Sequence, residues 1–393
     1  MNILLLGVGM QGKAALHDLW MNPAVTAIVA ADRELDPLRL YIQSRNYGAR
    51  VQTAFADAEI HSSLQKLLAA KPAVVVDLTP SRFSPLVAQE AMKAGVHLVN
   101  TVYVLPELRK LEAGIEAAGL TFLPEFGMDP GIDLVLLGRA VSHFDSVETI
   151  DSYGAGVPEA AAANNALKYK VTWTFEGVLR AYMRGGRLIR NGRAVSIKSN
   201  EMFNPENIHE LRIPGLGAFE AYANGDSLPY AEMLGIDPEK LQRLGRYSFR
   251  WPGHCEFWKK LVDLHLLDDE ALTLDGVTVN RRRFLAAAIE PHIRLGERER
   301  DVAVIRIDVT GIKDGKKKRA VLQIIDHRDL ATGFTAMSRT VGYTASIGAQ
   351  LVGSGQLKKR GLLSPLRDMP YEIFRDELAK RDIRVSEEIT DLA

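Results

Sequence analysis

A glycine-rich hexapeptide near the start of the chain restricts its possible folds more than any other feature. Gly7, Gly9 and Gly12 follow the pattern G-x-G-x-x-G. The motif comes directly after an apolar run at residues 3–6, which is typical of a strand buried on both faces of a sheet. The motif is followed by residues 14–20, whose apolar side chains would form one face of a helix. A strand, a glycine turn and a helix in this order predict the first unit of a Rossmann sheet.

The glycine loop predicts a site for the pyrophosphate of a bound dinucleotide. The first glycine permits a tight turn, the second lets the backbone approach the phosphates, and the third lets the helix pack on the strand. The first helical turn offers N–H groups and a partial positive charge to the phosphates. We expect the cofactor to contact the loop residues Gly7, Gly9, Met10, Gln11 and Gly12. A glycine turn without a ligand is the alternative.

Asp32 and Arg33, which follow the second predicted strand, bear on the choice of cofactor. Asp32 lies 20 residues after Gly12, where a carboxylate accepts hydrogen bonds from the ribose hydroxyls and repels a 2′-phosphate. This favours NAD over NADP. Arg33 would pair with that phosphate and reverse the preference, so NADP stays open. Thr79, after a later predicted strand, is expected to line the nicotinamide side of the crevice.

Strand and helix patterns alternate up to about residue 123. The predicted strands cover residues 3–6, 27–31, 74–78, 96–100 and 120–123, and further helices cover residues 84–94 and 108–118. Repeated strand–helix units indicate an α/β fold with a doubly wound parallel sheet.

The pattern changes near Gly127, where the predicted strands become longer and more polar. Strands are expected at residues 148–153, 194–197, 303–309 and 319–326, and helices at residues 175–182, 256–264 and 281–289. The Asp-Gly dipeptide at residues 314–315 predicts a hairpin turn between the last two strands. We predict three segments: a dinucleotide-binding Rossmann domain at 1–126, an inserted α+β substrate and dimerisation domain at 127–330, and a C-terminal return at 331–393 that packs on the Rossmann domain.

Composition argues against several classes of protein. Lys and Arg number 49 against 49 Asp and Glu, so the chain lacks the positive excess that nucleic acids and anionic membranes attract. A single cysteine, Cys255, forms neither an internal disulfide nor a thiolate metal cluster. No group of His, Cys and carboxylate residues has the spacing of a metal site, and the N-terminal apolar run is too short for a signal peptide or a membrane span. We expect a cytoplasmic protein that acts on a small molecule, with no metal, nucleic-acid or membrane partner.

A stretch rich in small residues, at residues 345–353, predicts a helix that packs closely against another surface. That surface is either the sheet of the same chain or a second copy of the protein. A homodimer is our expectation.

Four segments carry a family resemblance. The most specific is Leu123-Pro124-Glu125-Phe126-Gly127-Met128-Asp129-Pro130-Gly131-Ile132-Asp133, and the others begin at Asn164, Arg250 and Thr335. In this order the segments resemble the saccharopine dehydrogenase family, which also contains lysine 6-dehydrogenases. The resemblance implies a Rossmann domain, a second domain inserted before a C-terminal return, and NAD(P)-dependent hydride transfer at a carbon–nitrogen bond.

Within that family the segments point to more than one substrate. The central segments resemble glutamate-forming saccharopine dehydrogenases, which convert L-saccharopine to L-glutamate and allysine, and this is the function we expect. The compact length and residues 355–361 resemble lysine 6-dehydrogenases, which release ammonia from L-lysine. A polyamine-type imine as substrate and a catalytically silent NAD(P)-binding sensor stay open. Several saccharopine enzymes carry a Tyr-Cys pair where this chain has Tyr153-Gly154, so no role for that thiol is carried over.

Three residues in the matched segments are candidates for proton transfer. Asp129 and Asp133 follow a predicted strand, where the loops of an open α/β sheet reach the ligand crevice. One carboxylate would orient the amine and the other exchange protons, unless one of them caps the following helix. Because a histidine ordinarily titrates near neutral pH, His254 is a candidate general base, with a purely structural role as the alternative.

Cationic residues in these segments are candidates for binding the substrate carboxylates, because guanidinium groups bind carboxylates in a fork. The candidates are Arg250, Arg339 and Arg180, with Lys168 and Lys170 as point charges. Tyr103 is expected to line the nicotinamide pocket, although packing explains it equally well. Trp173 and Phe175 are predicted core residues.

Overall fold

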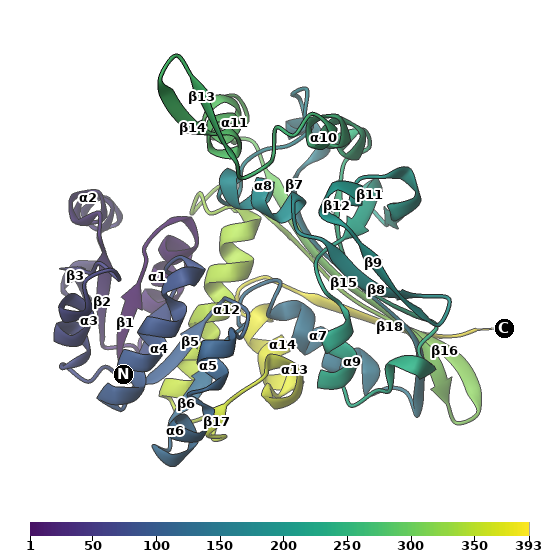
Figure 1. Ribbon diagram of the computed structural model, residues 1–393. Helices are drawn as coiled ribbons and strands as arrows, with labels where there is room; N and C mark the ends of the chain where they lie inside the picture. The colour runs from purple at the N-terminus through teal and green to yellow at the C-terminus, as the bar shows by residue number, and fades with distance from the viewer. Residues whose placement is uncertain (393) are drawn as a thin grey trace. The chain divides into compact units, whose positions relative to one another are not determined.

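The computed structural model describes residues 1–392, which fall into two compact units (Figure 1). The first unit comprises Met1–Val135 and Ser338–Arg384, and the second comprises Leu136–Met337 and the chain from Val385 onward. The predicted C-terminal return at residues 331–393 is therefore divided between the two units. Its helices belong to the first unit, whereas its last strand pairs within the second.

The first unit is built on a seven-stranded parallel sheet in the order β17-β6-β5-β4-β1-β2-β3. The strands are β1 (Asn2–Leu6), β2 (Ala27–Asp32), β3 (Val51–Phe55), β4 (Val74–Asp77), β5 (His97–Asn100), β6 (Thr121–Leu123) and β17 (Gly361–Leu362). The strand order reverses between β1 and β4, which is where doubly wound sheets bind ligands. The predicted fold class is confirmed, and β3 and β17 add two strands that we did not predict.

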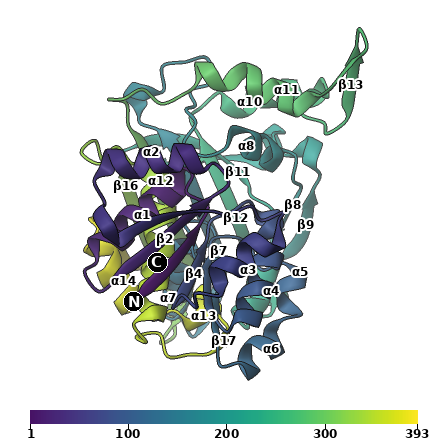
Figure 2. The ribbon, with the colours of Figure 1, turned by 90° about the vertical axis from the view of Figure 1, so that its left-hand side faces the viewer.

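Helices cover both faces of this sheet, and Figure 2 shows α1 and α2 on one side of the strands and α3 and α4 on the other. Aliphatic side chains of α3, α4, α5 and α6 pack on alternate residues of the strands, such as Leu4, Leu6 and Val75. The helices are α1 (Met10–Met21), α2 (Leu35–Arg45), α3 (His61–Leu68), α4 (Ser84–Ala94), α5 (Pro106–Arg109), α6 (Glu112–Ala117), α12 (Ala336–Gly353), α13 (Pro365–Asp368) and α14 (Tyr371–Ala379). The helix α7 (Ile132–Val141) begins in the first unit and continues into the second, which starts at Leu136.

The small residues of α12 pack against α1 and against Phe126 and Val99 at the sheet of the same chain. A Cβ on Gly342 would lie 2.4 Å from the Gln11 carbonyl oxygen, and one on Gly348 would lie 2.6 Å from the Phe126 ring. Contacts this close require glycine. Since Ala345 and Ala349 are fully buried as well, this face of α12 is occupied within the first unit.

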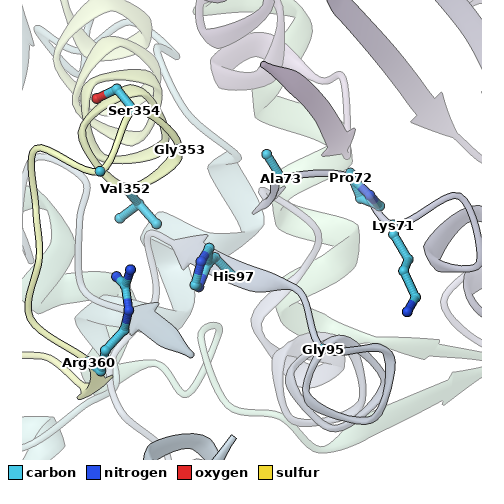
Figure 3. A pocket seen from close by; sticks show the side chains of 10 residues that line it. Lys71, Pro72, Ala73, Gly95, His97, Val352, Gly353, Ser354 and Arg360 are labelled. Atoms are coloured by element: carbon cyan, nitrogen blue, oxygen red, sulfur yellow. The ribbon is translucent and has the colours of Figure 1, made fainter. Parts of the chain in front are cut away.

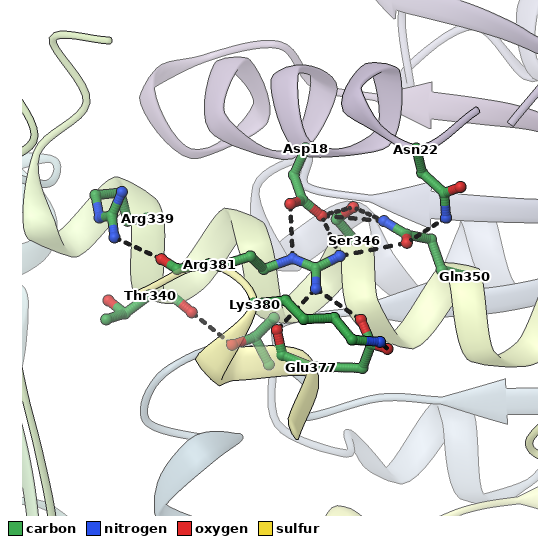
Figure 4. Close-up of polar contacts among 10 residues, drawn as sticks. Asp18, Asn22, Arg339, Thr340, Ser346, Gln350, Glu377, Lys380 and Arg381 are labelled. Atoms are coloured by element: carbon green, nitrogen blue, oxygen red, sulfur yellow. Dashed lines mark hydrogen bonds and ion pairs between the residues drawn. The ribbon is translucent and has the colours of Figure 1, made fainter. Parts of the chain in front are cut away.

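A buried polar network fastens the C-terminal helices to α1 (Figure 4). The guanidinium of Arg381 donates to both carboxylate oxygens of Asp18, over 2.6 and 2.9 Å. Ser346 and Gln350 of α12 donate to the same carboxylate. Arg381 also pairs with Glu377 of α14. The network joins residues more than 300 positions apart.

The second unit is built on a mixed sheet in the order β10-β11-β12-β7-β15-β16-β18, with β8 paired to β12 and β9 paired to β8. Only the β12–β7 pair is parallel. The strands are β7 (Ser146–Pro158), β8 (Gly186–Arg190), β9 (Arg193–Ile197), β10 (Ile208–Ile213), β11 (Gly217–Ala223), β12 (Arg243–Arg250), β15 (Asp301–Lys313), β16 (Lys316–His327) and β18 (Val385–Asp391). Asp314 and Gly315 have the positive φ angles of the predicted hairpin turn, 52° and 73°.

An aromatic core lies between this sheet and its helices, and it contains Phe175, Tyr182 and Trp258. The helices are α8 (Phe175–Tyr182), α9 (Leu228–Met233), α10 (His254–Asp263) and α11 (Arg281–Ile289), and a separate hairpin is formed by β13 (Ala271–Leu274) and β14 (Val277–Asn280). Phe175 lies in the core as predicted. The prediction for Trp173 is wrong, because its side chain is 43% exposed.

Candidate functional site

The glycine loop between β1 and α1 combines two glycines required by packing with one that is not. Gly7 has a φ of 83°, and a Cβ there would lie 2.7 Å from the Leu78 carbonyl oxygen. A Cβ on Gly12 would lie 2.1 Å from the Gly7 carbonyl oxygen. A Cβ on Gly9 would meet nothing within 4 Å, so this glycine leaves open space at the start of α1, where no side chain caps the helix. These residues fit a pyrophosphate held by backbone N–H groups.

Asp32 connects the end of β2 to this loop. Its carboxylate accepts hydrogen bonds from the Val8 N–H at 2.8 Å and from the Glu34 N–H at 3.0 Å. Two of its lone-pair positions are therefore used within the protein. The neighbouring Arg33 side chain is 64% exposed and lies 3.6 Å from the Glu34 carboxylate. Met10 is 42% exposed at the same edge of the sheet.

The loop after β4 is held by a buried carboxylate that we did not predict as part of the site. Asp77 accepts from both the N–H and the hydroxyl of Thr79, at 3.0 and 2.6 Å. Burial raises the pKa of Asp77 to about 6, against the lowering effect of these two bonds. Asp77 fixes Thr79 at the carboxyl edge of β4. The sequence feature that could have identified Asp77 is a charged residue at the end of the apolar run Val74-Val75-Val76.

The loop after β6 places Asp129 and Asp133 differently. Asp133 is 2% exposed and accepts from the Gly131 N–H at 2.7 Å, whereas Asp129 is partly exposed. Gly131 has a φ of 146°, and a Cβ there would lie 2.0 Å from the Gly127 carbonyl oxygen, so the turn requires glycine. Asp133 lies in the first turn of α7, where it fixes the turn that carries Asp129.

A second buried carboxylate, Glu125, acts on Asp133. Burial raises the pKa of Asp133 to about 7, and the charge of Glu125 adds to the rise. Glu125 is 7% exposed and has a φ of 57°. Its N–H donates to the Val102 carbonyl at 3.1 Å and its Oε1 accepts from the Val104 N–H at 3.4 Å, which ties it to the loop that carries the partly exposed Tyr103. The carboxyl ends of β5 and β6 thus hold a group that changes protonation near neutral pH.

In the second unit, His254 lies inside the aromatic core and is 2% exposed. Its Nε2 lies 2.7 Å from the Tyr182 hydroxyl, and its Nδ1 lies 3.3 Å from the Leu167 carbonyl oxygen. Burial lowers the pKa of His254 to about 3, and the charge of Arg250 adds to this. A neutral ring with its proton on Nδ1 satisfies both contacts. These are the contacts of a structural residue, and we do not retain His254 as the general base.

The cations expected to bind substrate make contacts of their own. Arg250 is 8% exposed, donates to the Phe249 carbonyl at 2.7 Å and lies over the Tyr169 ring. Lys170 is buried and pairs with Glu299 at 2.9 Å.

Arg180 is exposed on α8 and pairs with Glu176 at 3.2 Å. The exposed Lys168 donates to the Pro252 carbonyl at 3.2 Å. Arg339 belongs to the first unit, where it is 8% exposed and donates to the Arg381 carbonyl at 2.9 Å (Figure 4).

Two family models together match nearly the whole chain. The saccharopine dehydrogenase NADP binding domain matches residues 3–123, and the saccharopine dehydrogenase C-terminal domain matches residues 127–383. The chain belongs to the saccharopine dehydrogenase family. This confirms the resemblance, and it places the chain among oxidoreductases with an NADP-binding domain. NAD as the main cofactor, which Asp32 favoured, is not confirmed.

Relatives in this family span the chain at low identity. The saccharopine dehydrogenase [NADP(+), L-glutamate-forming] of Saccharomyces cerevisiae is 26% identical over 93% of the chain and 93% of its own length. The alpha-aminoadipic semialdehyde synthase of Bos taurus is 25% identical over 94% of the chain, which spans only 46% of that protein. The carboxynorspermidine synthase of Vibrio alginolyticus is 22% identical over 93% of the chain. The structure of the yeast saccharopine dehydrogenase matches 99% of both chains with a TM-score of 0.87 at 24% identity, so the fold is shared.

A pocket of about 470 Å³ lies at the opposite, amino-terminal edge of the parallel sheet (Figure 3). It is lined by Lys71 and Ala73 before β4, by His97 at the start of β5, by Arg360 and by the end of α12. The glycine loop and the carboxyl groups of Glu125 and Asp133 lie at the carboxyl ends of the strands of this sheet. The pocket is therefore not part of the candidate site.

Within residues 1–392, no group of three or more His, Cys, Asp and Glu side chains is arranged to hold a metal ion. In the same residues, no helix is long and apolar enough to span a membrane.

Proposed function

We propose that this chain catalyses the NADP-dependent oxidation of L-saccharopine to L-glutamate and allysine. The observation that carries the proposal is that glutamate-forming saccharopine dehydrogenases of two yeasts align with it over 93% and 99% of its length, and over equal shares of their own. In the overall reaction, saccharopine, NADP⁺ and water give glutamate, allysine, NADPH and a proton. A hydride leaves the ε-carbon of the lysine part of saccharopine, water adds to the resulting imine at this carbon, and the bond between this carbon and the nitrogen then breaks.

Residues of the first unit supply the positioning and the proton chemistry in this proposal. The bound dinucleotide supplies the hydride acceptor. Gly9 and the first turn of α1 bind its phosphates, and Thr79, held by Asp77, contacts its nicotinamide end. Asp129, on the accessible turn after β6, orients the substrate amine. Asp133 exchanges a proton near neutral pH, as its raised pKa of about 7 permits.

The test is a comparison of L-saccharopine and L-lysine as substrates of the purified full chain. We expect saccharopine to reduce NADP⁺ and to release one glutamate per NADPH formed. Reduction with lysine and release of ammonia would overturn the proposal in favour of lysine 6-dehydrogenase. Binding of NADPH without turnover of either substrate would overturn it in favour of a sensor or of an untested amine, such as the product of carboxynorspermidine synthase.

We further propose that Arg33 binds the 2′-phosphate of NADP. Asp32 already accepts two backbone N–H groups, and the guanidinium beside it is exposed. Replacing Arg33 with alanine should raise the KM for NADP⁺ about 10- to 100-fold, because a charge-assisted hydrogen bond is worth about 1.5–3 kcal/mol. The KM for NAD⁺ should change little.

A matched control for this variant is Arg39→Ala, which removes an arginine of similar exposure that pairs with Asp36 on α2. Equal effects of Arg33→Ala on the KM values of both cofactors would show that Arg33 does not read the 2′-phosphate.

A further inference from the structure

The pocket at the amino-terminal edge of the parallel sheet combines cationic and apolar side chains, and within residues 1–392 no Asp or Glu lines it (Figure 3). Lys71 and Arg360 supply the charge, and Pro72, Ala73 and Val352 supply apolar surface. All of these residues belong to the first unit. The volume of about 470 Å³ is within the range of about 300–1,000 Å³ that small-molecule sites have in proteins.

A buried threonine fixes two polar side chains at this pocket. The N–H of Thr121, the first residue of β6, donates to Nδ1 of His97 at 2.9 Å. The hydroxyl of Thr121 accepts from the guanidinium of Arg360 at 2.9 Å and donates to the Lys359 carbonyl at 2.8 Å. Thr121 is fully buried, so these hydrogen bonds are shielded from water. His97 and Arg360 therefore share one anchor, and Figure 3 shows their side chains next to each other.

The hydrogen bond from Thr121 also sets the tautomer of His97. Because Nδ1 accepts a hydrogen bond, the proton of the neutral ring is on Nε2. Burial and the charge of Arg360 lower the pKa of His97, so the ring is neutral at neutral pH. Within residues 1–392, Nε2 has no hydrogen-bond partner. The ring therefore has one N–H group to donate to a ligand in the pocket.

The charges at the pocket leave a positive excess. Within residues 1–392, neither Lys71 nor Arg360 pairs with a carboxylate. The nearby Asp368 pairs with Lys359 at 2.6 Å, so its charge is already offset. The helices α4 and α12 end at the pocket, and the carbonyl end of each carries about half a negative charge. Two full positive charges exceed these two partial charges by about one, and such a pocket attracts anions.

We propose that this pocket binds a small organic anion through its carboxylate or phosphate group. The guanidinium of Arg360 and Nε2–H of His97 donate to oxygens of that group, which has lone pairs for both. The three apolar side chains accommodate a short carbon chain. Lys71, whose side chain points outward in Figure 3, adds a point charge at the rim. The pocket lies at the opposite edge of the sheet from the proposed catalytic residues, so the proposal does not depend on the proposed activity.

NMR titration of the ¹⁵N-labelled full chain tests the proposal. The backbone amide signals of Gly95 and Gly355, which line the pocket, should shift saturably as butyrate or inorganic phosphate is added at constant ionic strength. Butyramide, the neutral counterpart of butyrate, should leave these signals in place. Binding of either anion supports the proposal and identifies the group that is bound. No shift up to about 10 mM, which would fill about 90% of a site with a Kd of about 1 mM, would overturn it, and so would an equal shift with butyramide.

Substitutions at the two donors test where the anion binds. Arg360→Met should weaken anion binding about 10-fold or more, because it removes a charge-assisted hydrogen bond. His97→Asn keeps an acceptor near the position of Nδ1 for the Thr121 N–H but lacks the Nε2 donor, and it should weaken binding by a similar factor. The control is Arg109→Met, since Arg109 is an exposed arginine of the first unit outside the pocket and pairs with no carboxylate within residues 1–392. Equal anion affinities of Arg360→Met and Arg109→Met would overturn the proposal.

Discussion

Replacing Asp133 with asparagine should lower kcat of saccharopine oxidation by about 100-fold or more, while the KM for NADP⁺ stays unchanged. The asparagine oxygen can still accept from the Gly131 N–H, so the turn that carries Asp129 is kept. The amide cannot exchange a proton, and a positioned acid–base group contributes about 10²–10⁴-fold to a rate. The variant therefore separates proton transfer from loop positioning.

The same substitution should stabilise the protein in mildly alkaline solution. The pKa of Asp133 is raised on folding, from an ordinary value near 4 to about 7, because burial disfavours the charged form. Below pH 4 the carboxyl is protonated in both states and has no effect on stability. Between pH 4 and 7 the unfolded chain loses this proton first, so stability falls as pH rises. Above pH 7 the full cost, on the order of 2–4 kcal/mol, is present in the wild type and absent from the variant.

Two measurements check these expectations for Asp133→Asn. The pH profile of kcat should lose its limb near pH 7, and urea unfolding at pH 8 should show a higher midpoint than the wild type. Asp301→Asn is the control, since Asp301 is also buried with a pKa raised to about 6 and lies in the second unit. It should leave the limb near pH 7 in place. A limb that persists in Asp133→Asn would mean that Asp133 only positions the loop.

Local patterns in the sequence were sufficient to predict five of the seven strands of the parallel sheet. The glycine loop, the apolar strands and the helix at residues 84–94 depend on neighbours in the chain, and the structure has each of them. Of the two neighbouring carboxyl groups Glu125 and Asp133, the sequence predicted only Asp133 as a site residue. Glu125 joins Asp133 because the backbone turns through a positive φ and folds the loop after β5 over it, which is a tertiary effect.

Burial of polar residues in the second unit could not be predicted from single motifs. His254 and Arg250 stand in a segment that resembles the family, yet the side chains that enclose them, Tyr169 and Tyr182, come from residues about 70 or more positions earlier. The exposed Trp173 and the buried Phe175 differ because α8 begins between them and points its first apolar residue inward. The hairpin at residues 271–280 was not predicted, although Asp275-Gly276 is the same turn signal that predicted the hairpin at residues 314–315.

Replacing Arg381 with methionine should give the largest loss of stability, about 3–5 kcal/mol in the free energy of unfolding. The side chains of Arg381 and Asp18 are 10% and 8% exposed, and the variant leaves the Asp18 carboxylate buried without its cation. Ser346 and Gln350 still donate to that carboxylate, but they carry no charge to offset its desolvation.

Urea unfolding separates this loss from a general sensitivity to the removal of arginine. Arg375→Met, on α14 shortly before Arg381, removes a 42% exposed guanidinium that pairs with Glu372 and Asp376, and it should cost less than about 1 kcal/mol. Adding Asp18→Leu to Arg381→Met should recover part of the loss, because removing both charges ends the desolvation of an unpaired ion. A double variant less stable than Arg381→Met alone would show that packing around Asp18, rather than its charge, sets the stability. In either case the measurement reports on how firmly the C-terminal helices hold α1, the helix whose first turn is proposed to bind the cofactor phosphates.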